Sequence, residues 1–105
     1  MTMPLIFELL DGMGMRVWSG GELDDSPRNR IPDVDYMQYP TLAGVDRFGS
    51  TSFNDRQMGF LADELESLLC SDLLQVGSTA LVGDILSACR NGSTHAHWRL
   101  EVMGD

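Results

Sequence analysis

Paired histidines, paired aspartates and two cysteines are the residues of this chain whose types and spacing could support chemistry. His95 and His97 stand two positions apart in THAHWRLEVM, a spacing that places both side chains on one face of a strand. Two imidazoles on one face form part of a transition-metal site, and Glu8 or Glu101 could supply a third ligand. Since no other histidine or cysteine has a recognisable ligand spacing, we predict solvated histidines, no metal and no cofactor. A metal-binding or small-molecule module on this face is the alternative.

The aspartates form two close pairs, Asp24–Asp25 and Asp33–Asp35, of a kind that can serve acid–base catalysis. Nothing in the sequence gives either pair a pocket or a partnered nucleophile, and carboxylates in loops are usually solvated. The glycine-rich stretches DGMGM and GSTALVGD lack the lysine and the spacing of a phosphate-binding loop. We therefore predict that the protein is not an enzyme.

The two cysteines, Cys70 and Cys89, have no neighbouring histidine in the sequence. They end two segments that we expect to form antiparallel helices, so the length of the second helix separates them by roughly 15 Å. This distance is far beyond the reach of a disulfide bond. We predict two free thiols that serve as small core residues.

The net charge of −9 comes from 16 acidic and 7 basic residues, and every basic residue is an arginine. This balance argues against direct binding of nucleic acid, which needs clustered positive charge, and it suits a basic protein partner. No apolar run approaches the roughly 20 residues of a membrane span. The first residues, MTMPLIFELLDG, lack the basic start of a signal peptide, so we expect a cytoplasmic protein. The length of 105 residues predicts a single domain over 1–105.

The clearest element is a helix over residues 53–70. Asn54 suits the N-cap, and Gln57 three positions later completes a capping box. Phe53 and Met58 occupy the two positions of a hydrophobic staple. The predicted buried face has helical spacing and consists of Met58, Leu61, Ala62, Leu65, Leu68 and Leu69.

Two strands, 5–10 and 15–18, are predicted around the turn residues Asp11, Gly12 and Gly14. Opposed residues in a hairpin point to the same face, so a loop of odd length, three or five residues, would pair Phe7 with Val17. The core side is then Leu5, Phe7, Leu9, Met15 and Val17, and the outer side is Ile6, Glu8, Arg16 and Trp18.

Residues 19–52 show no hydrophobic period. We expect the acidic first half of this segment to be exposed and the second half, from Tyr36 to Phe48, to be packed across the core. A second helix is predicted over 79–90, with Ser78 as its cap and Asn91-Gly92 as its stop. Its buried residues would be Leu81, Val82, Ile85, Leu86 and Cys89. Alternation over 94–102 predicts a final strand.

This order of elements predicts an α+β domain of two layers, a three-stranded antiparallel sheet covered by two helices (β-β-α-α-β). The outer face of the sheet would gather Ile6, Glu8, Arg16, Trp18, His95, His97, Arg99 and Glu101. An exposed tryptophan beside arginine is typical of protein interfaces. The alternatives are that the long loop covers Trp18, or that a homodimer does.

The segment YPTLAGVDRFGSTSFNDRQM resembles a segment of small uncharacterised bacterial proteins, many from actinomycetes. The compact acidic form is also similar in type to immunity proteins, which neutralise a toxin by binding it. The resemblance brings no catalytic residues. The net charge of −9, the acidic unpatterned loop and the lack of a catalytic constellation predict a protein that binds another protein, as an immunity-type or other inhibitor of a basic, nucleic-acid-handling target. The predicted partner-binding residues are Arg16, Trp18, Glu22, Asp24, Asp25, Asp33, Asp35 and Arg99.

Overall fold

The capping box at Asn54 starts helix α2 (Asp55–Leu69) as the sequence predicts. In the computed structural model, which describes residues 4–22, 31–74 and 76–104, Asn54 Oδ1 accepts from the Gln57 amide at 2.8 Å. Gln57 Oε1 accepts from the Asn54 amide at 2.9 Å. The buried face of the helix is the predicted one, except that Leu69 is half-buried.

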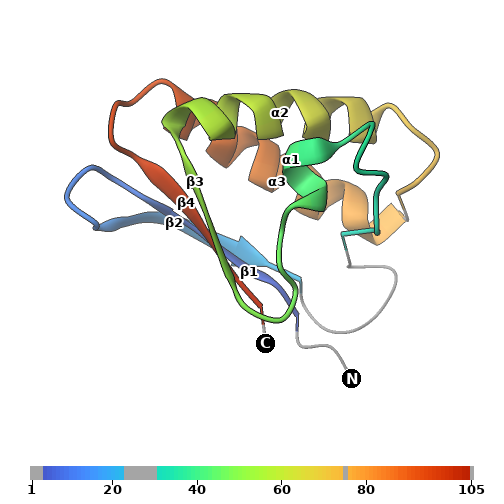
Figure 1. The fold of residues 1–105 in the computed structure, drawn as a ribbon, viewed down its shortest axis with the longest axis horizontal. Helices are drawn as coiled ribbons and strands as arrows, with labels where there is room; N and C mark the ends of the chain where they lie inside the picture. Colours follow the sequence, from blue (N-terminus) through green and yellow to red (C-terminus); the bar gives the residue numbers. More distant parts are fainter. Residues whose placement is uncertain (1–3, 23–30, 75, 105) are drawn as a thin grey trace.

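Helices cover one face of an antiparallel sheet, which confirms the predicted α+β class (Figure 1). The strands are β1 (Ile6–Leu10), β2 (Arg16–Gly21), β3 (Ser50–Asn54) and β4 (Arg99–Met103), and their order in the sheet is β2-β1-β4-β3. Helix α3 (Val76–Ser93) packs beside α2, and α1 (Pro40–Ala43) is a single short turn against α2. The predicted count of three strands is wrong because β3, STSFN, has Phe53 as its one apolar residue, so its sequence shows no alternation of apolar with polar residues.

The hairpin between β1 and β2 has the predicted odd loop, Gly12-Met13-Gly14, closed by the Asp11 amide donating to Met15 O at 2.9 Å. Gly14 has a φ of 83°, a left-handed conformation that favours glycine. The predicted register is nevertheless wrong. Arg16 opposes Leu10 and Trp18 opposes Leu9, so Val17 is an extra residue in a β-bulge.

The bulge inverts the faces of β2. Phe7 lies opposite Gly20 and not opposite Val17, so Trp18 joins the helix side of the sheet while Met15 and Val17 are exposed. A Cβ on Gly20 would lie 2.6 Å from Trp18 Cζ2, so the missing side chain at this position makes room for the indole. The prediction of Trp18 on the outer face is therefore wrong, and α3, not the long loop, lies against it.

Helix α3 is longer at both ends than predicted. Ser78 is buried within it and is not its cap, and the helix continues past Gly92 to Ser93. A Cβ on Gly92 would lie 2.5 Å from Met58 Sδ, so this glycine permits close packing and does not stop the helix. The buried residues of α3 include Val82, Ile85, Ala88 and Cys89, whereas Leu81 and Leu86 are half-buried.

The last strand is shorter than predicted because residues 94–98 terminate α3. The amides of Thr94 and His95 donate to the carbonyls of Asn91 and Gly92 at 3.3 and 3.2 Å. These bonds satisfy carbonyls that the helix end would otherwise leave unpaired. His97 has a φ of 70°, which an extended strand does not contain.

The prediction for the segment between β2 and β3 is confirmed only in part. Tyr39 and Leu42 are buried as predicted, but Tyr36, Met37 and Phe48 are exposed. Ile31, in the half predicted to be exposed, is buried. Glu64 of α2 holds α1 in place by accepting from the amides of Thr41 and Leu42 at 3.1 and 2.9 Å. Among the described residues, no helix is long and apolar enough to cross a membrane.

Candidate functional site

His95 and His97 do not share a strand face, contrary to prediction, because both precede β4. The His95 ring stacks on Trp98 with centroids 3.9 Å apart, and its Nδ1 lies 2.9 Å from Asn91 O. Throughout residues 4–22, 31–74 and 76–104, no group of three or more His, Cys, Asp or Glu side chains is placed to hold a metal ion. The two-histidine face on which the metal-binding alternative depended is absent from this part of the chain.

Both cysteines are free thiols, as predicted. Cys89 is a buried core residue, but Cys70 is exposed, so its prediction as a core residue is wrong. Burial raises the pKa of the Cys89 thiol to about 12, although the nearby Arg90 opposes this shift. A thiol with such a pKa stays protonated at neutral pH and is a poor nucleophile.

Glu22 is buried and is not available to a partner, so its prediction as a partner-binding residue is wrong. Its carboxylate accepts from the amides of Leu5 and Ile31 at 2.9 and 2.6 Å. Arg47 donates to both carboxylate oxygens, at 3.1 and 3.2 Å, and also to Ile31 O. This ion pair joins the start of β1 and the end of β2 to two points of the following segment.

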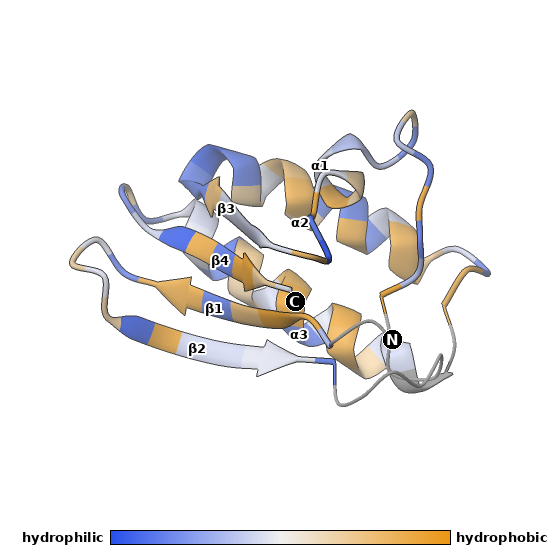
Figure 2. Cartoon of the chain, turned by 60° about the horizontal axis from the view of Figure 1, so that its bottom comes forward, coloured by the Kyte–Doolittle hydropathy of each residue, from blue (hydrophilic) through white to orange (hydrophobic). Residues whose placement is uncertain are grey.

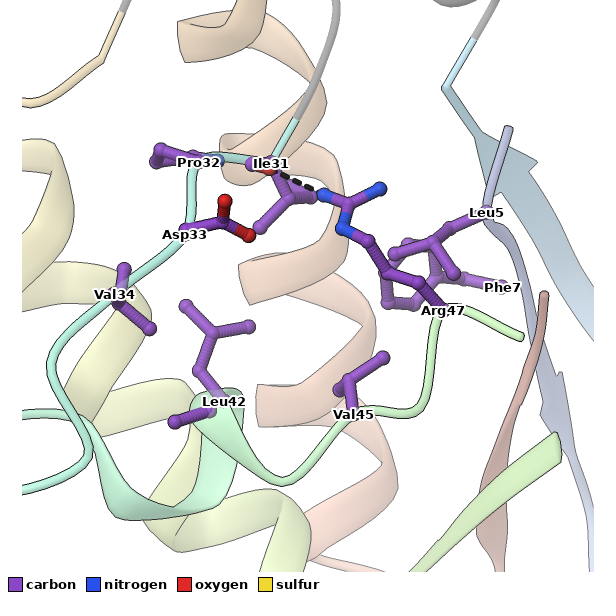
Figure 3. A pocket seen from close by; sticks show the side chains of 10 residues that line it. Leu5, Phe7, Ile31, Pro32, Asp33, Val34, Leu42, Val45 and Arg47 are labelled. Carbon is purple, nitrogen blue, oxygen red and sulfur yellow. Dashed lines mark hydrogen bonds between the residues drawn. The ribbon is translucent and has the colours of Figure 1, made fainter. Parts of the chain in front are cut away.

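A small cavity of about 120 Å³ is lined in part by Arg47, one member of this ion pair (Figure 3). Most of its wall is apolar, and it includes Leu5, Phe7, Ile31, Val34, Leu42 and Val45. The guanidinium of Arg47 lies at the wall, but its hydrogen bonds are directed to Glu22 and Ile31 O. Among the described residues that line the cavity there is no nucleophile, and Asp33 is the only carboxylate, so these residues supply no pair of groups for acid–base chemistry.

The open face of the sheet carries two neighbouring ion pairs. Arg16 bonds Glu8 at 3.2 Å, and Arg99 bonds Glu101 at 2.7 Å. Glu8 and Glu101 oppose each other across β1 and β4, so each arginine offsets repulsion between two carboxylates. The predicted partner-binding residues Arg16 and Arg99 are therefore on this exposed face, away from Trp18.

A turn over residues 33–38, which we call the acidic turn, combines exposed apolar groups with carboxylates. The side chain of Asp35 accepts from the Met37 amide at 3.1 Å, and Asp35 O accepts from the Tyr39 amide at 2.8 Å. Tyr39 is buried at one end and Val34 packs on the core at the other. Between these anchors, Tyr36 is 67% exposed and Met37 is 87% exposed.

The carboxylates of the acidic turn are not neutralised by a cationic side chain of the described residues. Asp33 and Asp35 are exposed and form no ion pair within the described part of the chain. By contrast, four arginines are paired with carboxylates: Arg16, Arg47, Arg90 and Arg99. The predicted residues Asp24 and Asp25 lie outside the described residues.

The exposure of Tyr36 and Met37 differs from the prediction, which placed both side chains in the core on the basis of their hydrophobicity. The available signal was the aspartate two positions before Met37, since an Asp side chain commonly bonds the backbone amide two residues later. The same construction exposes Met13 after Asp11 and Phe48 after Asp46. Asp35 thus fixes apolar residues outward in a way that hydrophobicity alone does not reveal.

No family model matches the chain, and searches of curated proteins and of solved structures also found no match. The function of the chain is therefore inferred from the geometry and charge of its own residues.

Proposed function

We propose that the protein acts by binding a basic protein partner in the cytoplasm, as an immunity-type or other inhibitor of a nucleic-acid-handling protein. The observation that carries this proposal is the acidic turn, where Tyr36 and Met37 are exposed on a fixed backbone directly after Asp33 and Asp35. Tyrosine and methionine are enriched at protein interfaces. Their exposure on a structured turn suits contact with another protein.

The two kinds of residue in the turn have different roles in this proposal. Asp33 and Asp35 contribute to long-range attraction of a positively charged surface, which raises the association rate. Tyr36 and Met37 are the anchors that fill pockets on the partner and slow its dissociation. Because Asp35 and the buried Tyr39 already hold the backbone, binding loses little conformational entropy at this turn.

Photocrosslinking in the cells that naturally produce the protein identifies the partner. A photoreactive phenylalanine analogue at position 36 should crosslink one basic protein, and the same analogue at Met13 should not. Met13 is a suitable control because it is 90% exposed and also lies in a turn stabilised by an aspartate. Absence of any specific crosslink from position 36 would contradict the proposal.

Association kinetics with the purified partner then test the role of charge. The double variant Asp33→Asn/Asp35→Asn should slow association by roughly 3- to 10-fold at low salt, and the difference should shrink as salt is added. Asparagine retains the oxygen that bonds the Met37 amide, so the turn itself is preserved. Asp72→Asn is the matched control, since Asp72 is exposed outside the turn. Equal association rates for all three proteins, at every salt concentration, would refute charge steering by this turn.

A further inference from the structure

Among the strands of the described residues, β2 is the last of the sheet and is paired on one side only; Figure 2 shows its open edge along the lower border of the sheet. The Glu22 amide donates to Leu5 O at 2.9 Å, so these two residues form a hydrogen-bonded pair of the ladder. Bonded pairs alternate with non-bonded pairs in an antiparallel ladder. The register then leaves Ser19 and Gly21 in non-bonded pairs, with their backbone N–H and C=O groups directed away from β1.

A groove of about 350 Å³ runs beside this edge, between β2 and α3. Leu9, Val17, Trp18 and Ala88 supply its apolar wall, and Asp84, Ser87 and Asn91 of α3 supply the polar groups. Trp18 lines the groove because the β-bulge turns its side chain to the helix side of the sheet. Asp84 forms no ion pair among the described residues.

We propose that the β2 edge and this groove form a docking site for an extended, basic segment of another protein. A strand added to β2 would bond the backbone groups of Ser19 and Gly21, and its residue opposite Gly20 would point to the helix side. An apolar side chain at that position enters the groove against Trp18, and a lysine or arginine two positions along the segment, on the same face, reaches Asp84. The site lies on a different surface from the acidic turn, so it goes beyond the proposed function.

Charge decides between a foreign segment and a second copy of this chain. Two copies paired through β2 would each bring a net charge of −9, and Asp84 offers no complement to another Asp84. Like charges across an interface disfavour association, whereas a basic segment gains attraction. The opposite edge, β3, is less suited because the Gln57 side chain already bonds the Asn54 amide.

Selection of displayed random 12-residue peptides on the immobilised protein tests the site with defined probes. Enriched peptides should carry an apolar residue and a basic residue two positions apart, and on binding they should slow hydrogen exchange at the Ser19 and Gly21 amides. Ser19→Pro should weaken these peptides tenfold or more, because it removes an outward N–H that β1 does not use. Asp84→Arg, on the exposed side of α3, tests the same site without altering the strand and should weaken binding to a similar extent.

Ser52→Pro on β3 is the control and should leave peptide affinity unchanged, with melting curves confirming that each variant is folded. The proposal is overturned if no peptide is enriched, or if enriched peptides bind the Ser19→Pro and Asp84→Arg variants as tightly as the parent. Protection at a surface other than β2 would also overturn it. So would a homodimer in analytical ultracentrifugation that Ser19→Pro dissociates, since the second copy would then be the occupant.

Discussion

Glu22→Gln is expected to lower the free energy of unfolding by about 3–5 kcal/mol, a large part of the stability of a domain this size. The Glu22 and Arg47 side chains are only 2% and 14% exposed, so water cannot compensate the arginine that the change leaves unpaired. The glutamine amide would also direct N–H donors at Arg47 or at the amides of Leu5 and Ile31, which are donors themselves. Urea unfolding, read as a shift of the midpoint, measures the loss.

Glu8→Gln is the matched control for that measurement. Glu8 bonds Arg16 at 3.2 Å, but Arg16 is 64% exposed, and a solvent-screened pair of this kind contributes less than about 1 kcal/mol. We expect Glu22→Gln to unfold at a much lower urea concentration than Glu8→Gln. If they unfolded at the same urea concentration, the Glu22–Arg47 pair would not be the buried link described above.

Leu65→Ala is expected to destabilise the domain by about 2–5 kcal/mol, because the side chain is fully buried and its loss leaves a cavity between helix and sheet. Asn54→Ala should remove only about 1 kcal/mol, through the lost cap of α2. Chemical denaturation of both variants provides the comparison.

Leu73→Ala controls for the chemistry of the substitution. Leu73 is 51% exposed after the end of α2, so its truncation should change stability by less than about 0.5 kcal/mol. A silent Leu65→Ala, or an equal effect at Leu73, would show that the core face of α2 is assigned wrongly.

Local signals explain why α2 could be predicted almost to the residue. Its cap, its staple and its apolar face are all encoded within 53–70, and each favours the same boundaries. The odd hairpin loop was predictable for the same reason, since Asp11 and Gly14 form it between themselves and their near neighbours.

The placement of Trp18 was not predictable from local sequence, because the bulge at Val17 depends on tertiary packing. Alternation along β2 assigns faces only if every residue pairs, and one extra residue reverses them. The result is favoured by the space at Gly20 and by packing on α3, neither of which a pairing argument contains. The strand prediction for residues 94–98 failed for a related reason. Apolar and polar residues alternate there as in a strand, but the segment terminates α3.

The candidate site was predictable only in its charge. Asp33 and Asp35 were identified from the sequence, and both are exposed. Tyr36 and Met37 looked like core residues, since hydrophobicity does not record that Asp35 holds the backbone between two buried anchors. Glu22 looked like a surface acid because its partner, Arg47, is 25 positions away.

The most direct test of partner binding by the acidic turn is a dissociation rate. It is measured for the partner that photocrosslinking identifies, without a crosslink, from the Met37→Ala and Met13→Ala variants. Both methionines are highly exposed, at 87% and 90%, and both lie in turns held by an aspartate, so neither change should alter the stability of the free protein. We predict that Met37→Ala raises the dissociation rate roughly 10- to 30-fold, the loss of one anchor worth about 2 kcal/mol, while Met13→Ala leaves it unchanged. Equal dissociation rates for the two variants and the parent would contradict the claim that the acidic turn is the partner-binding surface.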